Sequence, residues 1–353
     1  MRIEQLTFTR FLAAISIVIF HYGKEIFPFN TEWTSFLFRQ ANVGVSFFFI
    51  LSGFVMVIAY WQKEKISAAN YFLKRFARIY PVCLLAALML LGFKGAEYFL
   101  FPDKSDLNLV DFFLSLSLFQ AFIPAKAMSF NTPAWSITVE CFFYLLFPLL
   151  FNRVYKKVSY KKLFIPLVLI WTISQFALHF LLDSSFYTGY PSASHNFIYY
   201  FPLMHLNEFL IGNLAALFFM FVMKHKSLKT DLWILITLVF GAIALRYNTV
   251  LSFHNGLLAV LFVPLILFIS SNKGYFTKIN NWPFLIFLGE ISYGVYILQK
   301  PVFMGVKASF MVLNINNPTV LFYVGIGVLL LVSALSFKYV ETPLRKKISS
   351  IKI

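Results

Sequence analysis

Apolar segments of about 20 residues recur along this chain, and this is the length that an α-helix needs to cross the hydrocarbon core of a bilayer. The 353 residues are 60% apolar and only 12% charged, whereas about 25% of the residues of an ordinary soluble domain are charged. We therefore expect an all-α, polytopic membrane bundle of about ten transmembrane helices, because helices satisfy their own backbone hydrogen bonds in lipid. The predicted spans are residues 6–27, 41–61, 77–94, 133–152, 163–182, 200–222, 231–248, 252–271, 283–306 and 319–341.

The distribution of basic residues sets the predicted topology. A further apolar stretch, residues 107–123, carries Asp111 and is amphipathic. If it does not cross and the amino terminus is cytoplasmic, 22 of the 30 Lys and Arg residues lie on the cytoplasmic side and 8 on the other, as the positive-inside rule requires. Counting it as a span would place the five basic residues of segment 153–162 outside. We therefore predict an interfacial or re-entrant segment on the outer face, and both termini in the cytoplasm.

Nothing in the sequence divides the chain into parts. No internal repeat, low-complexity tract or Gly/Ser linker is present, so we expect a single integral membrane domain over residues 1–353 without a soluble extension. The net charge of +16 comes from short basic clusters between apolar segments, which is typical of cytoplasmic loops rather than of a nucleic-acid site. Cys83 and Cys141 lie in apolar stretches and are interpreted as packing residues. The sequence has no CxxC, HExxH, Walker or GxSxG motif, so no metal site is expected.

Ionisable side chains inside a span cost about 2.5–3.5 kcal/mol each, so each one is a candidate functional residue. Arg10 and His21 are eleven residues apart, which predicts that they share one face of the first span, about 16 Å apart along its axis. Glu140 enters the fourth span from outside and reaches nearly the depth of His21. We predict that His21 is a catalytic general base and that Glu140 orients its ring and raises its basicity. The alternatives are a buried imidazole satisfied by a carbonyl group and a structural carboxylate.

Two further groups of polar residues are candidates. Glu208, with His205 one turn above it, and Gln299 are expected in the same outer layer as His21. Arg75 and Arg78 lie one turn apart at the cytoplasmic end of the third span. Arginine can grip a phosphate with two parallel hydrogen bonds, although a simple cytoplasmic anchor is the alternative. The small residues Ser52 and Gly53 are interpreted as helix-packing positions.

In chain order, these segments resemble the acyltransferase 3 family, the membrane O-acyltransferases that modify bacterial surface polysaccharides and related acceptors. Arg10 and His21 resemble the family's signature of Arg, ten residues and His. Residues 47–53 resemble its second motif, and Arg75 and Arg78 match its Arg-x-x-Arg motif. The resemblance implies that these two arginines bind acyl-CoA.

The carboxyl-terminal half continues the resemblance with two departures. Residues 135–144 are close to the family's Trp-Ser-x-x-x-Glu-x-x-Phe-Tyr block, and residues 341–345 resemble its closing motif. Residues 205–209 read His-Leu-Asn-Glu-Phe where many members have Arg before Pro-Glu-Phe. After Tyr293 and its neighbours, Gln299 stands where His is common. Gln299 cannot carry a proton, so it is expected to act only through hydrogen bonds. The residues expected to contact substrate or to support the site are Trp135, Ser136, His205, Glu208, Tyr293 and Gln299.

The resemblance implies transfer of an acyl group, with acetyl as the family default, from cytoplasmic acyl-CoA to a hydroxyl of an extracytoplasmic or lipid-linked saccharide. An exopolysaccharide, O-antigen or capsule sugar is the expected acceptor class, and the bacterial cytoplasmic (inner) membrane is the expected location. The acyl-CoA donor would lie on Arg75, Arg78 and Arg10, with no permanently bound cofactor. His21 would take the proton of the hydroxyl; an acyl-histidine intermediate is the alternative mechanism. A transporter or flippase, and an inactive structural subunit of a polysaccharide export system, are the competing functions.

Overall fold

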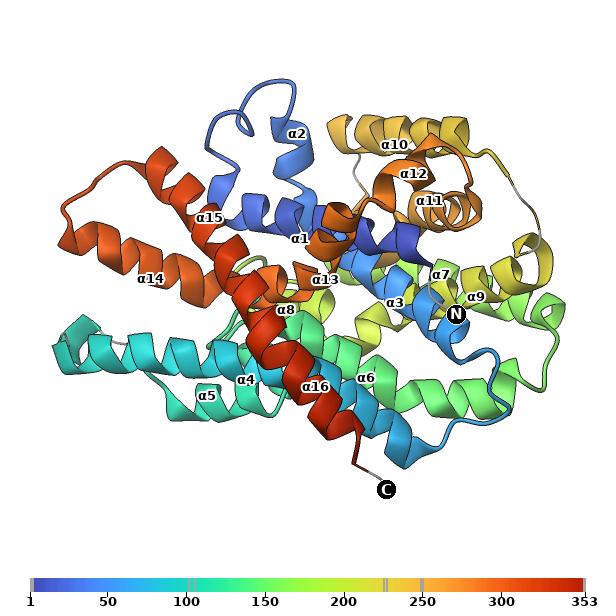
Figure 1. Ribbon diagram of the computed structural model, residues 1–353, viewed down its shortest axis with the longest axis horizontal. Coiled ribbons are helices and arrows are strands. Elements are labelled where there is room, and N and C mark those ends of the chain that lie inside the picture. The colour runs from blue at the N-terminus through green and yellow to red at the C-terminus, as the bar shows by residue number, and fades with distance from the viewer. Residues whose placement is uncertain are drawn as a thin grey trace.

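The computed structural model describes residues 3–100, 102–104, 106–224, 226, 228–247 and 251–351, and within them the chain is helical and has no β-strand. The longer helices are α1 (Thr7–Val18), α3 (Gly44–Tyr60), α4 (Ala68–Leu100), α6 (Ala134–Leu150), α7 (Tyr160–Asp183), α9 (Leu206–Phe218), α10 (Asp231–Arg246), α11 (Ala259–Ser271), α13 (Pro283–Ile297), α14 (Gln299–Val312) and α15 (Pro318–Ser336). The shorter ones are α2 (Ser35–Phe38), α5 (Leu109–Leu116), α8 (Ala193–Tyr200), α12 (Tyr275–Asn280) and α16 (Thr342–Ser349). Figure 1 shows that most of the long helices run roughly along the long axis of the molecule.

Seven helical segments of the described residues are long and apolar enough to cross a membrane. They are Glu4–Gly23, Ala41–Tyr60, Ala68–Leu100, Ala134–Tyr155, Tyr160–Asp183, Ala193–Met223 and Pro318–Ser349. The other three predicted spans correspond to the shorter apolar helices α10, α11 and α13. The prediction of an all-α, multi-pass membrane bundle is confirmed.

The predicted span 283–306 is not one continuous helix, because it is interrupted at Leu298. Pro301 has no amide hydrogen to donate to the carbonyl group of Ile297, four residues earlier. The side-chain amide of Asn131 donates to that carbonyl instead, at 3.3 Å. The chain therefore ends α13 at Ile297 and begins α14 at Gln299.

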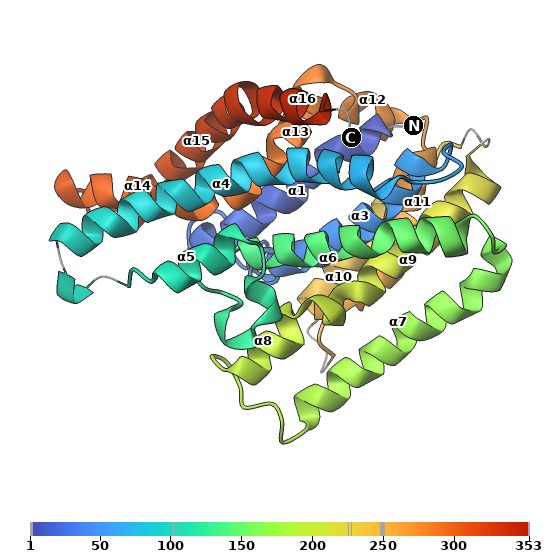
Figure 2. The ribbon, with the colours of Figure 1, turned by 90° about the horizontal axis from the view of Figure 1, so that it is seen from below.

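Segment 107–123 is folded into short helical pieces. Helix α5 has eight residues, which corresponds to about 12 Å and is too short to cross a bilayer. It lies beside α4 (Figure 2), and an ion pair of 2.8 Å between Asp111 and Lys126 ties it to the following turn. Lys94 of α4 binds Asp106 just before the segment, and this hydrogen bond holds the pKa of the Asp106 carboxyl below its usual value.

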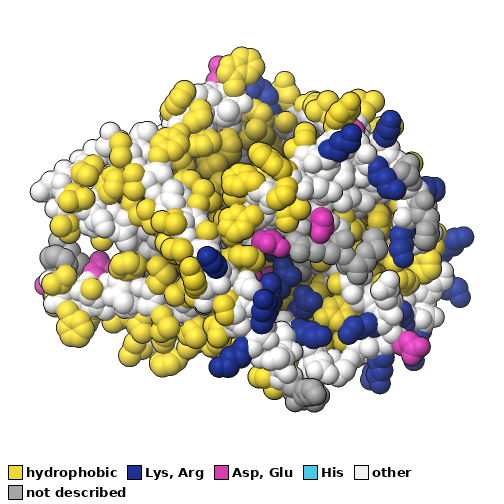
Figure 3. Space-filling view, viewed as in Figure 1, with side chains coloured by type: hydrophobic (Ala, Val, Ile, Leu, Met, Phe, Trp, Pro, Cys, Tyr) yellow, Lys and Arg dark blue, Asp and Glu magenta, His cyan; other side chains and the backbone are white. Residues whose placement is uncertain are grey.

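Basic side chains gather at one end of the molecule. In Figure 3, Lys and Arg lie mostly over the right-hand part of the surface, and both termini lie toward that side in Figure 1. The loop that carries Lys156 and Lys157 joins α6 to α7 at the same end. This charge asymmetry is the one that the positive-inside rule associates with a cytoplasmic face. Three residues used in the sequence predictions lie outside the described residues: Arg2 and Lys352, two of the 22 basic residues assigned to the cytoplasmic side, and Asn248, the predicted end of the seventh span.

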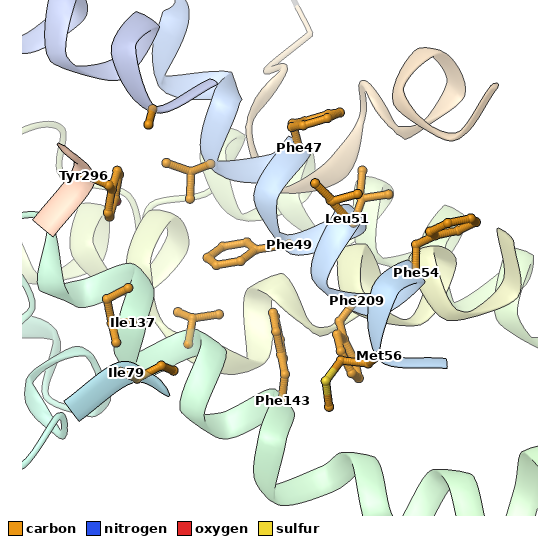
Figure 4. Close-up of a cluster of buried hydrophobic side chains, with 14 of the residues drawn as sticks. Phe47, Phe49, Leu51, Phe54, Met56, Ile79, Ile137, Phe143, Phe209 and Tyr296 are labelled. Carbon is orange, nitrogen blue, oxygen red and sulfur yellow. The ribbon is translucent and has the colours of Figure 1, made fainter. Parts of the chain in front are cut away.

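Helices α3 and α9 cross at two glycines. A Cβ atom on Gly53 would lie 2.2 Å from the carbonyl oxygen of Phe209, and one on Gly212 would lie 2.1 Å from that of Ile50. Small residues thus allow the two backbones to touch, as is common in membrane bundles, and the packing role predicted for Gly53 is confirmed. Around the crossing, Phe143 stacks on Phe209 with ring centroids 4.7 Å apart (Figure 4).

Candidate active site

A cavity extends from the basic end of the bundle into its interior. Its wider part, of about 280 Å³, is lined by residues of α1, α3, α4 and α13 and by the π-helical turn Phe337–Glu341 with the adjoining α16. Its deeper part, of about 110 Å³, continues between α1, α3, α4, α6 and α13. Arg10, Arg78 and Tyr293 line both parts, so the two form one path that narrows toward the opposite face.

Arginine is concentrated along this path. Arg10, Arg78 and Arg345 line the wider part, together with Glu290 and Glu341. Glu341 is buried and its carboxylate lies 3.7 Å from the guanidinium of Arg345. The wider part therefore has an excess of positive charge, which suits an anionic ligand.

Arg75 lines the deeper part inside a cage of tyrosine rings. Its guanidinium carbon lies 5.3–5.6 Å from the ring centroids of Tyr60, Tyr71 and Tyr144, within the range of cation–π attraction. One terminal nitrogen donates to the Tyr60 hydroxyl at 3.2 Å. Its Nε is buried and has no hydrogen-bond partner among the described residues. The cage fixes the plane of the guanidinium and leaves a donor available.

Glu140 also lines the deeper part. Its Oε1 accepts hydrogen bonds from the Tyr144 hydroxyl at 2.5 Å and from the Ser52 hydroxyl at 3.4 Å. The prediction that Glu140 orients His21 is therefore wrong, because the carboxylate is engaged inside the cavity and His21 has another partner. Ser52 was interpreted as a packing residue, but it lines the cavity.

His21 lies in a π-helical turn, Ile19–Gly23, that ends the first span. Such turns insert an extra residue into a helix and are frequent at functional sites. The wider turn changes the rotation of His21 relative to Arg10. Arg10 lines the cavity whereas His21 is exposed and does not. That the two residues share one face of the first span stays a prediction.

The hydrogen-bond partner of His21 is Gln299, the first residue of α14. Nδ1 of His21 lies 2.7 Å from Oε1 of Gln299, and Nε2 of Gln299 donates to the carbonyl oxygen of Tyr296 at 2.6 Å. Gln299 is fully buried. The two residues were predicted to share one layer, and the structure brings them into direct contact.

Tyr296 connects this pair to the cavity. Its side chain lines the deeper part, and its hydroxyl lies 2.8 Å from the Ser136 hydroxyl. Along α13 it is the cavity-lining residue farthest from the basic end, beyond Tyr293. Tyr293 donates to the carbonyl oxygen of Ile79 at 2.9 Å. Of the predicted supporting residues, Ser136 and Tyr293 thus contribute to the cavity wall.

His205 and Glu208 form a separate buried pair outside the cavity. Nδ1 of His205 lies 2.6 Å from Oε2 of Glu208, and Nε2 donates to the carbonyl oxygen of Tyr199 at 2.9 Å. Because Nε2 must carry a hydrogen, the pair is either an imidazolium with a carboxylate or a neutral imidazole with a carboxylic acid, and it is net neutral in both cases. Trp135 packs on the His205 ring with centroids 5.3 Å apart. None of the three lines the cavity, and their supporting role stays a prediction.

Three site residues were missed at the level of sequence: Tyr144, Tyr296 and Arg345. Tyr144 and Arg345 end two of the motifs quoted above, which was an available signal. Tyr296 lies beside Tyr293 on α13, and no intramembrane charge marks it. The described residues contain no group of three or more His, Cys, Asp and Glu side chains that could hold a metal ion.

Comparison with known proteins assigns the chain to a family. The model of the acyltransferase 3 family, described as an acyltransferase domain, matches residues 3–338. The chain belongs to this family. Its relatives include acyltransferase MdmB of Streptomyces mycarofaciens, 28% identical over 66% of this chain and 59% of the relative. No solved structure matches the chain.

Two other relatives of this acyltransferase 3 family member match almost its whole length. They are peptidoglycan O-acetyltransferase OatA of Listeria monocytogenes, 25% identical over 96% of the chain and 55% of the relative, and O-acetyltransferase OatA of Staphylococcus aureus, 23% identical over 96% and 56%. The chain therefore spans a little over half the length of these curated relatives.

Proposed function

We propose that this protein transfers an acyl group, acetyl in the simplest case, from cytoplasmic acyl-CoA to a hydroxyl of an extracytoplasmic or lipid-linked saccharide. The observation that carries this proposal is a narrowing cavity with arginines at its basic end and the His21–Gln299 pair next to its opposite end. The names of the relatives, an acyltransferase and two O-acetyltransferases, support the reaction class. The charge asymmetry supports a location in the bacterial cytoplasmic membrane.

The donor fits the basic end. The phosphates of acyl-CoA would bind Arg10, Arg78 and Arg345 in the wider part of the cavity, and the thioester arm would extend into the narrow part past Arg75. Besides Arg10, Arg75, Arg78 and Glu140, the narrow part is lined by neutral Tyr, Ser and apolar side chains, which suit an uncharged chain with amide groups. The thioester would then lie near Tyr296, where the cavity ends.

The acceptor fits the opposite side. His21 is exposed there, and Gln299 connects it to Tyr296 at the end of the cavity. A saccharide hydroxyl would lose its proton to His21 and attack the thioester carbonyl. A new C–O bond forms, the C–S bond breaks, and the thiolate of CoA leaves and receives the proton. Holding the two reactants at the two ends of one path supplies the proximity on which such a transfer depends.

The test uses purified protein in nanodiscs with radiolabelled acetyl-CoA and isolated cell-envelope saccharide. We expect release of free CoA thiol and transfer of the label to saccharide. His21→Ala should lower the rate by about 100-fold or more, the usual scale for loss of a general base. His195→Gln changes another histidine that lies outside the cavity, and it should leave the rate unchanged.

Three results would argue against the proposal. A transporter would show neither thiol release nor labelled saccharide. A structural subunit would tolerate both His21→Ala and Glu140→Gln and would fully complement a deletion strain. Label that is trapped on His21 would replace the general-base mechanism by an acyl-histidine intermediate while retaining acyl transfer.

A further inference from the structure

Gln299 links His21 to the end of the cavity, and its hydrogen bonds also constrain the His21 ring. It is the first residue of α14, it is fully buried, and it touches both His21 and the backbone of Tyr296. We infer that Gln299 is a positioning residue that fixes the tautomer of His21, so that the hydrogen is on Nδ1 and the lone pair of Nε2 is the base. This inference rests on the proposed function.

The hydrogen bonds of Gln299 determine which of its atoms faces His21. The carbonyl oxygen of Tyr296 can only accept, so the Gln299 atom at 2.6 Å from it must be the amide nitrogen. The amide oxygen therefore faces Nδ1 of His21 at 2.7 Å. An amide oxygen cannot donate, so Nδ1 must carry the hydrogen. In the neutral ring, Nε2 is then unprotonated, and no described residue hydrogen-bonds to it.

The break between α13 and α14 holds Gln299 in this orientation. A continuous helix through Leu298 would have paired the carbonyl group of Ile297 with an amide hydrogen that Pro301 lacks. Asn131 satisfies that carbonyl from outside the helix. At the other side of the pair, Tyr22 stacks on Phe303 of α14 with ring centroids 3.9 Å apart. Both partners of the hydrogen bond are thus anchored by neighbouring contacts.

A neutral acceptor has an electrostatic consequence that a carboxylate would not have. A carboxylate at Nδ1 would stabilise the imidazolium form and keep His21 protonated at higher pH. The amide fixes the tautomer without adding a negative charge. On its own segment, Lys24 is the charged group that acts on His21.

In the part of the chain that the structure describes, no carboxylate of the elements packed against His21 acts on its ring. On α14, the ammonium of Lys300 binds the carbonyl oxygen of Phe130 and the Thr132 hydroxyl. From α15, Phe322 lies against Gly23, and the 3-10 turn Ala41–Val43 has no titratable side chain. Among the described residues, no neighbouring carboxylate therefore stabilises the protonated form of His21.

The tautomer can be measured without an activity assay. Protein labelled with ¹⁵N-histidine is examined by NMR, and the His21 signals are assigned by their absence in His21→Asn. We expect a protonated Nδ1 and an unprotonated Nε2 in the wild type, and loss of this preference in Gln299→Leu. A wild-type ring with its hydrogen on Nε2 would overturn the inference, whether or not acyl transfer is observed.

The pH dependence of acetyl transfer tests the consequence for catalysis. In Gln299→Glu the rate at high pH should be largely kept, and the acidic limb of the pH–rate profile should move up by about one to two pH units. In Gln299→Leu the rate at high pH should fall by about 10-fold or more. Gln175→Glu is a matched control, because Gln175 of α7 is also a buried glutamine, and its side-chain amide donates hydrogen bonds to Asn207 and Asn255.

The outcomes separate the inference from the function on which it rests. The control is expected to keep the wild-type profile even if the yield of folded protein drops. The role of Gln299 is overturned if the acidic limb of the pH–rate profile does not move in Gln299→Glu and the wild-type protein shows no preference for a hydrogen on Nδ1 of His21. A clear Nδ1–H signal in a protein that shows no acyl transfer overturns the proposed function and leaves the tautomer assignment in place.

Discussion

Arg75 shows how a single side chain can be prepared for a ligand before the ligand arrives. Three tyrosine rings surround its guanidinium, one terminal nitrogen is bound to Tyr60, and the buried Nε has no partner among the described residues. A buried donor without a partner costs free energy. Binding of an acceptor atom of the donor substrate would recover that cost.

Replacing Arg75 by lysine should therefore weaken donor binding while the charge is retained. A lysine ammonium has no planar face to lie among the rings and no Nε–H to offer. We expect Arg75→Lys to raise the KM for acetyl-CoA by about 10-fold, or about 1.4 kcal/mol, with a smaller effect on kcat. Steady-state kinetics in nanodiscs measures both. Lys74→Arg, at the exposed neighbouring position, should leave both unchanged, and an equal loss in that control would contradict a specific role.

At the scale of residues, sequence reasoning identified most members of the site but not their pairing. Arg10, Arg75, Arg78 and Glu140 all line one cavity. Intramembrane charge had suggested Arg10 and Glu140, and the pair of arginines one turn apart had suggested Arg75 and Arg78. Counting residues from a predicted helix end gives only the depth of a side chain. It does not give the tilt of the helix or the rotation that the π turn adds at His21, so the contact with Glu140 was predicted and the contact with Gln299 was not.

At the scale of elements, the joint between α13 and α14 depends on two residues that are far apart in the sequence. Pro301 removes a helix hydrogen bond, and Asn131 replaces it. The apolar window 283–306 indicated a continuous span because hydrophobicity does not register a missing amide hydrogen. Pro301 was the signal that could have predicted the break, whereas Asn131 lies in a turn before α6 whose position depends on the tertiary fold.

A double-mutant cycle tests this joint. Asn131→Leu leaves the buried carbonyl of Ile297 without a donor and should cost about 1–3 kcal/mol in free energy of unfolding. In a Pro301→Ala background, the new amide hydrogen can bind that carbonyl, so the same substitution should cost less. Denaturant unfolding in detergent gives the four free energies. Equal costs in both backgrounds would mean that the Asn131 bond does not substitute for the missing helix bond.

At the scale of the whole molecule, composition predicted the fold class, and the clustering of basic residues in loops predicted a basic end, better than any local feature. Apolar windows of about 20 residues predicted the helices, and basic loops such as the one with Lys156 and Lys157 predicted the basic end. The cavity could not be predicted in this way, because it is formed where five helices fail to fill the space between them. Its direction, with arginines at the basic end, nevertheless agrees with a donor that arrives from the side of the basic loops.

That direction leads to a sided prediction for protein reconstituted in vesicles. Lys157→Cys and Ser185→Cys are exposed positions in the loops at the two ends of α7, and labelling each with an impermeant thiol reagent reports which end faces outward. Acetyl-CoA added outside should be consumed only by protein whose Lys157 end is outside, because the arginine-lined part of the cavity lies at that end. Sealed vesicles of one orientation, compared with the same vesicles after permeabilisation, provide the measurement. Since donor and acceptor would enter from opposite ends, consumption from the Ser185 side would require a different path through the bundle.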